Sequence, residues 1–73
     1  MSDGWFYEGD RVRVSTELAH PYAGWIGVIL YCASDTESHK SWLRVRFDID
    51  SDGGRCSIEA NIYQSGYRFL KKV

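Results

Sequence analysis

Residues 41–49 carry the stretch SWLRVRFDI, which alternates between apolar and polar side chains more regularly than any other part of the chain. A period of two places successive side chains on opposite faces of a strand and indicates that one face is buried. The residues expected to face inward are Leu43, Val45, Phe47 and Ile49. Those expected to face outward are Trp42, Arg44, Arg46 and Asp48.

A hairpin is expected directly after this strand. Residues 50–54 read DSDGG, and Asp-Gly and Gly-Gly pairs tolerate the positive φ that tight hairpin turns require. Residues 55–62 then alternate again as the return strand. Its inward set is Cys56, Ile58, Ala60 and Ile62, and its outward set is Arg55, Ser57 and Glu59.

Two further strands are expected before residue 41. Residues 10–16 alternate, with Val12 and Val14 on one face and Arg11 and Arg13 on the other. Residues 25–32 form a nearly continuous apolar run, which at this length favours a buried strand. Glycine within that run, at Gly27, indicates a bulge or a tight bend. The polar segments 17–24 and 33–40 are expected to be loops.

The end of the chain completes the pattern. Residues 63–67 break the alternation and suggest a single 3₁₀ turn, and residues 69–73 suggest a last short strand. Five short strands in so small a chain predict an all-β fold, a small and strongly bent five-stranded barrel, because closing the sheet removes most of its exposed edges. We expect residues 9–73 to form this barrel and residues 1–8 to form an N-terminal arm packed on it, with Trp5-Phe6-Tyr7 over a barrel opening.

Length and composition limit the function. A chain of 73 residues holds one small domain, near the lower limit for a self-sufficient core. Nine Lys and Arg residues stand against ten Asp and Glu residues, which argues against binding nucleic acid or anionic membranes by bulk charge, though not against a local basic patch. Aromatic residues make up 15% of the chain, a high proportion for a core of this size.

The compartment is expected to be the cytoplasm. The sequence contains no apolar run long enough to span a bilayer, and its start lacks the basic and apolar regions of a signal peptide. In a reducing compartment Cys32 and Cys56 are expected to be reduced, buried thiols. His20 and His39 each stand alone in a polar loop, so we expect no metal or catalytic role for them.

The pattern resembles the SH3-like barrels of the electron-transport accessory proteins, which include a small accessory protein of photosystem I and the ferredoxin–thioredoxin reductase variable chain. The residues that carry the resemblance are Gly9-x-x-Val12-Arg13, Gly27-x-Ile29, Val45-Arg46-Phe47 and Leu70-x-x-Val73. The resemblance implies an SH3-like barrel without an active site or cofactor of its own, which docks on a larger redox partner.

Two weaker resemblances imply other functions. Gly24-x-x-Gly27-x-Ile29 is similar to the KOW motif of ribosome- and transcription-associated barrels, which implies contact with nucleic acid or ribosomal proteins. Trp25-x-Gly27 and Ile62-Tyr63, with Gly9-Asp-Arg-Val-Arg13, resemble the plasmid-borne, trimethoprim-insensitive dihydrofolate reductases, which implies an NADPH-dependent tetramer around one pore. Here Asn61 stands where those enzymes carry glutamine, and Val14-Ser15 replace their lysine region.

Four carboxylates have the spacing of a calcium loop. Asp48, Asp50, Asp52 and Glu59, with Gly53, match the pattern in which alternate carboxylates converge on one cation. The expected context, however, is two strands rather than two helices. The same letters also describe an ordinary acidic hairpin tip.

Aromatic and arginine residues are the candidate partner-binding groups. They are Tyr22, Trp25, Trp42, Arg44, Arg46, Arg11, Arg13 and Tyr63, and Tyr67 lies near the last turn. Such residues suit a carboxylate-rich protein surface, phosphates or stacked bases. Alternatively, Arg44 and Arg46 form ordinary cross-strand pairs with Glu59 and Ser57, and the loop aromatics cap the barrel.

The leading prediction is a non-catalytic accessory module that docks on a larger protein through a loop-end aromatic and arginine surface. The alternatives are the pore-type reductase and the KOW-like nucleic-acid binder. No membrane partner is expected, and the oligomeric state is left open.

Overall fold

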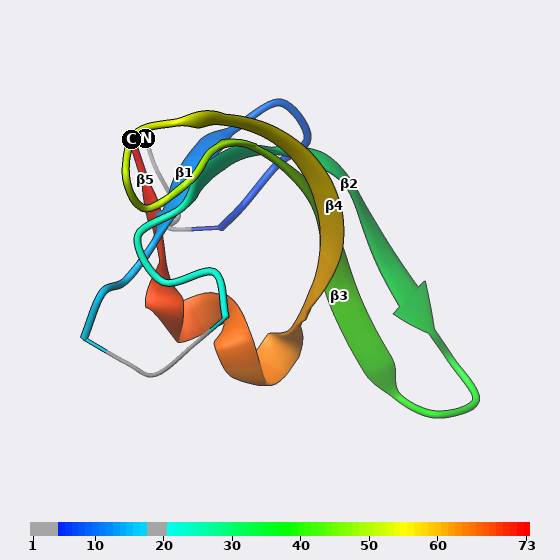
Figure 1. Cartoon of the computed structure of the whole chain (residues 1–73). Helices are drawn as coiled ribbons and strands as arrows, with labels where there is room; N and C mark the ends of the chain where they lie inside the picture. Colours follow the sequence, from blue (N-terminus) through cyan, green and yellow to red (C-terminus); the bar gives the residue numbers. More distant parts are fainter. Residues whose placement is uncertain (1–4, 18–20) are drawn as a thin grey trace.

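A computed structural model describes residues 5–17 and 21–73. Within these residues the chain forms five strands and one 3₁₀ helix. The elements, in chain order, are β1 (Arg11–Val14), β2 (Ile26–Asp35), β3 (Lys40–Ile49), β4 (Arg55–Tyr63), η1 (Gln64–Phe69) and β5 (Leu70–Lys72) (Figure 1). The all-β prediction with five strands is therefore confirmed.

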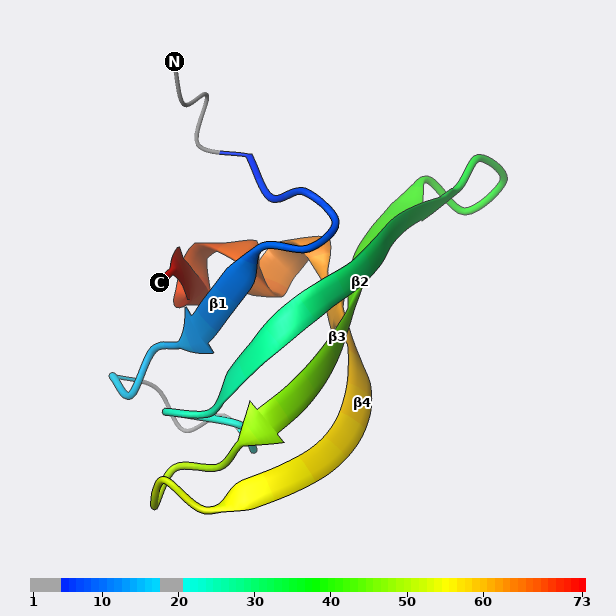
Figure 2. The same ribbon diagram turned by 90° about the horizontal axis from the view of Figure 1, so that it is seen from above.

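The strands form one antiparallel sheet in the order β4-β3-β2-β1-β5. The sheet curves strongly, so that β4 and the short β5 close round towards each other, with η1 between them (Figures 1 and 2). This gives the small, barrel-like shape that the alternating strands predict. No helix in the described part of the chain is long and apolar enough to cross a membrane.

The β2–β3 hairpin extends beyond the barrel-like body (Figure 2). β2 continues to Asp35, whereas residues 33–40 were expected to be a loop. Pairing continues because it depends on backbone groups, and here polar partners such as Ser34 with Ser41 and Asp35 with Lys40 lie opposite each other. Cys32 lies on this extension and is exposed, so the expectation that it is buried is wrong.

The core lies between the curved strands. Its buried residues are Val12, Val14, Ile29, Leu43, Val45, Phe47, Ile62 and Leu70. The alternation of residues 41–49 correctly predicts the inward side chains Leu43, Val45 and Phe47, each 0% exposed. Ile49, at the end of β3, is half-buried instead.

The inward set of β4 was predicted less well. Ile62 is buried, but Ile58 is 38% exposed, so its assignment to the core is wrong. Ile58 lies opposite Phe47, on the same face of the sheet. Because β4 is an edge strand, its inner face has a neighbour on one side only. Cys56 and Ala60 are accordingly half-buried and pack at the margin of the core.

Gly27 allows β2 to approach β3 closely within the sheet. A Cβ atom at this position would lie 2.6 Å from the carbonyl oxygen of Arg46 and 2.9 Å from a methyl group of Val45. The pairing of β2 with β3 also shifts register between Ile26 and Gly27. The predicted bulge or bend at this glycine is confirmed, and its cause is the close approach of two backbones.

The turn between β3 and β4 is built by one aspartate. The Oδ1 atom of Asp50 accepts hydrogen bonds from the backbone N–H groups of Asp52 and Gly54, each at 2.9 Å. Gly53 adopts a φ of 84°, which a glycine tolerates without strain. The predicted hairpin turn at residues 50–54 is confirmed.

The described part of the arm packs on the last turn of the chain. Phe6 is half-buried, and its ring meets Tyr67 edge-on at 6.3 Å. Lys72 makes an ion pair with Asp10 at 3.3 Å and places its ammonium group 5.9 Å from the centre of the Phe6 ring. Trp5 and Tyr7 remain about half exposed, at 47% and 51%.

Candidate interaction surface

One outer face of strands β2, β3 and β4 gathers three aromatic residues around two arginines. We call this the aromatic–arginine face and define it as Tyr31, Trp42, Arg44, Arg46 and Tyr63. Trp42 lies directly opposite Tyr63, and their ring centres are 6.2 Å apart. In the next row Tyr31 lies opposite Arg44. Tyr31 and Tyr63 are 48% and 51% exposed, so both rings are available for contact with another molecule.

A bulge in β2 brings Tyr31 to this face. The pairing with β3 shifts register between Ile29 and Tyr31, so that Ile29 points into the core and Tyr31 points outward. Strict alternation would have placed both side chains on the same face. Tyr31 was missed for this reason, because nothing in the apolar run 25–32 marks the inserted residue.

Arg44 is held in place by its neighbours on β4. Its Nε atom donates to Glu59 at 3.2 Å, and its Nη1 atom donates to Asn61 at 2.9 Å. The expected cross-strand pairing is therefore present for Arg44. Arg46 lies opposite Glu59, and no carboxylate in the described part of the chain lies within ion-pair distance of its guanidinium. The face thus presents one fixed arginine and one that is unpaired.

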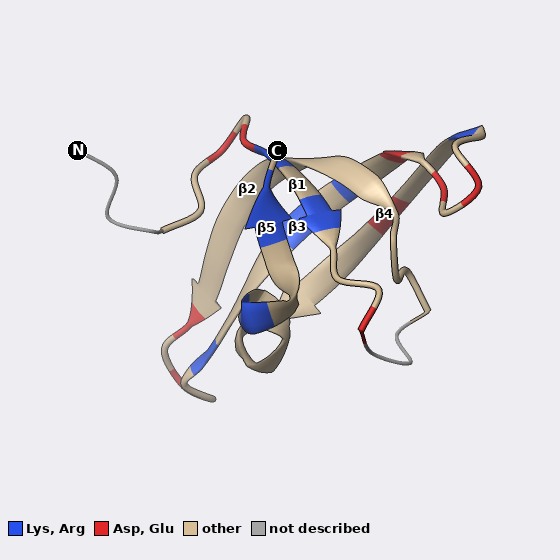
Figure 3. Ribbon diagram, turned by 90° about the vertical axis from the view of Figure 1, so that its left-hand side faces the viewer, with Lys and Arg blue, Asp and Glu red and all other residues tan. Residues whose placement is uncertain are grey.

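The two arginines of β1 have different neighbours; Figure 3 shows the Lys and Arg segments of β1 and of the adjacent β5 in blue. The Nη1 atom of Arg11 contacts Asp48 at 2.7 Å, which joins Arg11 to the β3 end of the aromatic–arginine face. This hydrogen bond holds the pKa of Asp48 below its usual value, against the opposing effect of burial. Arg13 instead lies opposite Lys71 of β5 and lines a separate shallow hollow of about 180 Å³.

Tyr22 and Trp25 belong to the inner side of the molecule. Tyr22 stacks on Phe47 with ring centres 4.9 Å apart, and Trp25 meets the same ring edge-on at 5.8 Å. Both are only partly exposed and pack against the core. The structure therefore does not bring these two predicted residues together with Trp42 and Tyr63.

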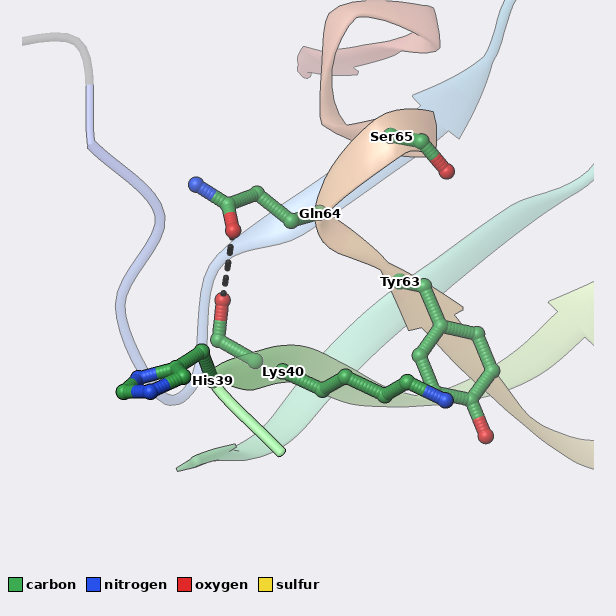
Figure 4. Close-up of a pocket in the computed structure, with 6 residues that line it drawn as sticks. His39, Lys40, Tyr63, Gln64 and Ser65 are labelled. Atoms are coloured by element: carbon green, nitrogen blue, oxygen red, sulfur yellow. Dashed lines mark hydrogen bonds between the residues drawn. The ribbon is translucent and has the colours of Figure 1, made fainter. Parts of the chain in front are cut away.

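A hollow of about 420 Å³ opens beside the aromatic–arginine face (Figure 4). We call it the β3–η1 hollow; its lining residues are His39, Lys40, Ser41, Tyr63, Gln64 and Ser65. Tyr63 belongs to both features. The hydroxyl of Ser41 donates to the Oε1 atom of Gln64 at 3.3 Å and ties the start of β3 to η1. Sequence patterns gave no sign of this hollow, because it forms only where η1 folds back beside β3.

Three of the four carboxylates of the calcium hypothesis are engaged separately. Asp48 pairs with Arg11, Glu59 pairs with Arg44, and Asp50 caps its own turn. Across residues 5–17 and 21–73, no group of three or more Asp, Glu, His or Cys side chains is placed to hold a metal ion. The geometry matches the acidic hairpin tip and gives the calcium loop no support. His20 lies outside the described residues.

The segment compared with the reductases lies on β4. Ile62 is buried in the core, while Asn61 accepts a hydrogen bond from Arg44 and Tyr63 points outward.

The two cysteines are free thiols, and burial raises the pKa of Cys56.

No protein-family model, curated protein or solved structure was found to match this chain. The resemblances given above therefore stay predictions, and function has to be argued from the surface itself.

Proposed function

We propose that this chain is a non-catalytic binding module with an SH3-like barrel, which docks on a larger protein through the aromatic–arginine face. The observation that carries the proposal is the gathering of Tyr31, Trp42 and Tyr63 on one outer face, with both tyrosines about half exposed. Tyrosine, tryptophan and arginine are the residues most enriched at the energetic centres of protein interfaces.

Charge favours a protein over a nucleic acid as the partner. Glu59 and Asp48 lie on the same outer face and engage Arg44 and Arg11. A surface that tracks a phosphate backbone presents several cations without neighbouring carboxylates. Here two of the four predicted arginines are already neutralised, and the carboxylates beside them would repel phosphates.

The test is affinity capture from an extract of the source organism, followed by binding measurements with the purified partner. We expect Trp42→Ala to weaken binding at least tenfold, the effect typical of a central interface aromatic. Trp5→Ala is the control, because Trp5 is an exposed tryptophan that lies on the arm, against Tyr67, and away from the aromatic–arginine face, whereas Trp42 is half-buried. Equal binding by both variants would remove the aromatic–arginine face from the proposal.

The alternative functions give different results in simple assays. A nucleic-acid binder would bind oligonucleotides with an affinity that falls steeply as salt rises. A pore-type reductase would be a tetramer and would oxidise NADPH with dihydrofolate. Either result would replace the docking proposal.

A further inference from the structure

The β3–η1 hollow lies where a partner seated on the aromatic–arginine face would extend past its edge. Tyr63 lines the hollow (Figure 4), and its ring also neighbours that of Trp42 on the aromatic–arginine face. The hollow is therefore continuous with the proposed docking surface. The residues that line the β3–η1 hollow determine which chemical group of a partner can bind there.

The lining offers hydrogen-bond donors and a positive charge. Lys40 and His39 come from the hairpin end, Ser65 comes from η1, and no Asp or Glu is among the described residues that line the hollow. Gln64 accepts from Ser41 through its Oε1 atom, so its amide nitrogen is left to donate. Such a lining is complementary to a carboxylate.

Lys40 is not neutralised within the described part of the chain. None of the ion pairs among residues 5–17 and 21–73 includes it. Its register partner across the hairpin is Asp35. The carboxylate of Asp35 accepts instead from the side chain of Ser38 and from the backbone N–H of Glu37, the latter at 3.0 Å, and these bonds lower the pKa of Asp35. Lys40 thus differs from Arg11, Arg44 and Lys72, each of which has a carboxylate partner.

We infer that the β3–η1 hollow receives an acidic side chain of the docked protein, with the carboxylate beside Lys40 and a neighbouring apolar side chain of the same segment against the Trp42–Tyr63 pair. This inference rests on the proposed docking function and specifies its partner as a segment that carries Asp or Glu next to an apolar residue. The surface charge of Lys40 gives the contact modest strength and the donor lining gives it selectivity.

The experiment titrates the full chain with the capped dipeptide amide acetyl-Glu-Leu-NH₂ and follows backbone amide signals by NMR. We expect saturable shifts at Lys40, Ser41 and residues 63–65, with an affinity in the millimolar range or weaker. Acetyl-Gln-Leu-NH₂ has the same shape without the charge and is expected to cause much smaller shifts. Equal shifts with both dipeptides, or shifts centred elsewhere, would overturn the inference.

Two variants locate the contact. Lys40→Gln is expected to weaken binding of the acidic dipeptide about two- to fivefold, as for loss of one exposed ion pair. Lys71→Gln is the control, because Lys71 is an exposed lysine on β5 beside the other hollow. An effect of Lys71→Gln as large as that of Lys40→Gln would show unspecific attraction and contradict the inference.

Two further measurements distinguish other molecules that could occupy the β3–η1 hollow. Inorganic phosphate that shifts the same amides more strongly than the dipeptide would indicate a free anion. Concentration-dependent shifts without any probe would indicate a second copy of this chain. Either outcome overturns the inference. A failed dipeptide titration alongside partner binding that depends on Trp42 overturns this inference and leaves the docking function standing. Partner binding that does not depend on Trp42 removes the docking function and this inference with it, even if the dipeptide binds.

Discussion

Two pairs of one tryptophan and one tyrosine lie against opposite faces of β3. Tyr22 and Trp25 are 5.1 Å apart on the inner side and both contact the Phe47 ring. Trp42 and Tyr63 are 6.2 Å apart on the outer side, where Tyr63 stays half exposed. Tryptophan and tyrosine therefore have different roles in the two pairs. The inner pair extends a core that is small for a domain, and the outer pair leaves aromatic surface for a partner.

The largest expected loss of stability comes from removing the Phe47 ring, which both Tyr22 and Trp25 contact. Phe47→Ala deletes a fully buried side chain and is expected to lower the free energy of unfolding by about 3–5 kcal/mol. Native domains have about 5–15 kcal/mol in total and a chain of 73 residues is small, so the variant should lose a large part of its stability. Urea denaturation followed by tryptophan fluorescence measures this.

Ile58→Ala is the control for that variant. Ile58 lies opposite Phe47 on the same face but is 38% exposed, and its truncation is expected to cost about 1 kcal/mol. If the two substitutions destabilise equally, the division between a covered β3 and an open β4 is wrong.

The comparison is tested directly by the same substitution in each pair. Trp25→Ala is expected to cost about 2 kcal/mol, because Trp25 packs against the core as well as against Tyr22. Trp42→Ala loses one cross-strand aromatic contact and is expected to cost less than about 1 kcal/mol. Thermal and urea unfolding of both variants give the values. A larger loss for Trp42→Ala would make the outer pair a structural feature instead of a docking surface.

The smallest expected effect concerns the outer ion pair of Arg11 with Asp48. Because the pKa of Asp48 is lowered in the folded protein, the pair stabilises the fold at pH values above the unfolded pKa of about 3.9, and this contribution is lost as pH falls through the folded pKa. At pH 6, Asp48→Asn should cost no more than about 1 kcal/mol. The difference in stability between the wild type and the variant should shrink as pH is lowered and vanish below the folded pKa of Asp48.

A double-mutant cycle checks that the effect belongs to the pair. In an Arg11→Gln background, the Asp48→Asn substitution should have almost no effect at pH 6, since the hydrogen bond is already absent. An undiminished effect in that background would mean that Asp48 acts through Arg46 or the backbone.

The strands of this fold could be predicted from the sequence because alternation reports which face a side chain takes. Leu43, Val45 and Phe47 follow it without exception. Alternation does not report whether the face is covered. Ile58 has the inward parity and is still exposed, because β4 is an edge strand. Which strand lies at the edge depends on the order of all five strands, and alternation within one strand does not reveal that order.

The candidate surface was predictable only in part. Trp42, Arg44 and Arg46 follow from alternation on β3, and Tyr63 continues the outward parity of β4 one residue beyond the predicted strand. Tyr31 depends on a bulge, and the place of Tyr22 depends on how its loop folds against Phe47. A bulge and a loop closure are set by tertiary packing, so neighbouring sequence letters do not encode them.

The pairing of β5 with β1 has a consequence for how the molecule forms. Val12 lies opposite Lys72, so the two strand neighbours of β1 come from distant parts of the sequence. Contacts between such distant residues slow the search for the native state, and all-β domains with many of them fold in milliseconds to seconds. Until β5 pairs with it, β1 has a strand neighbour on one side only, so this long-range pairing is expected to be among the last contacts to form.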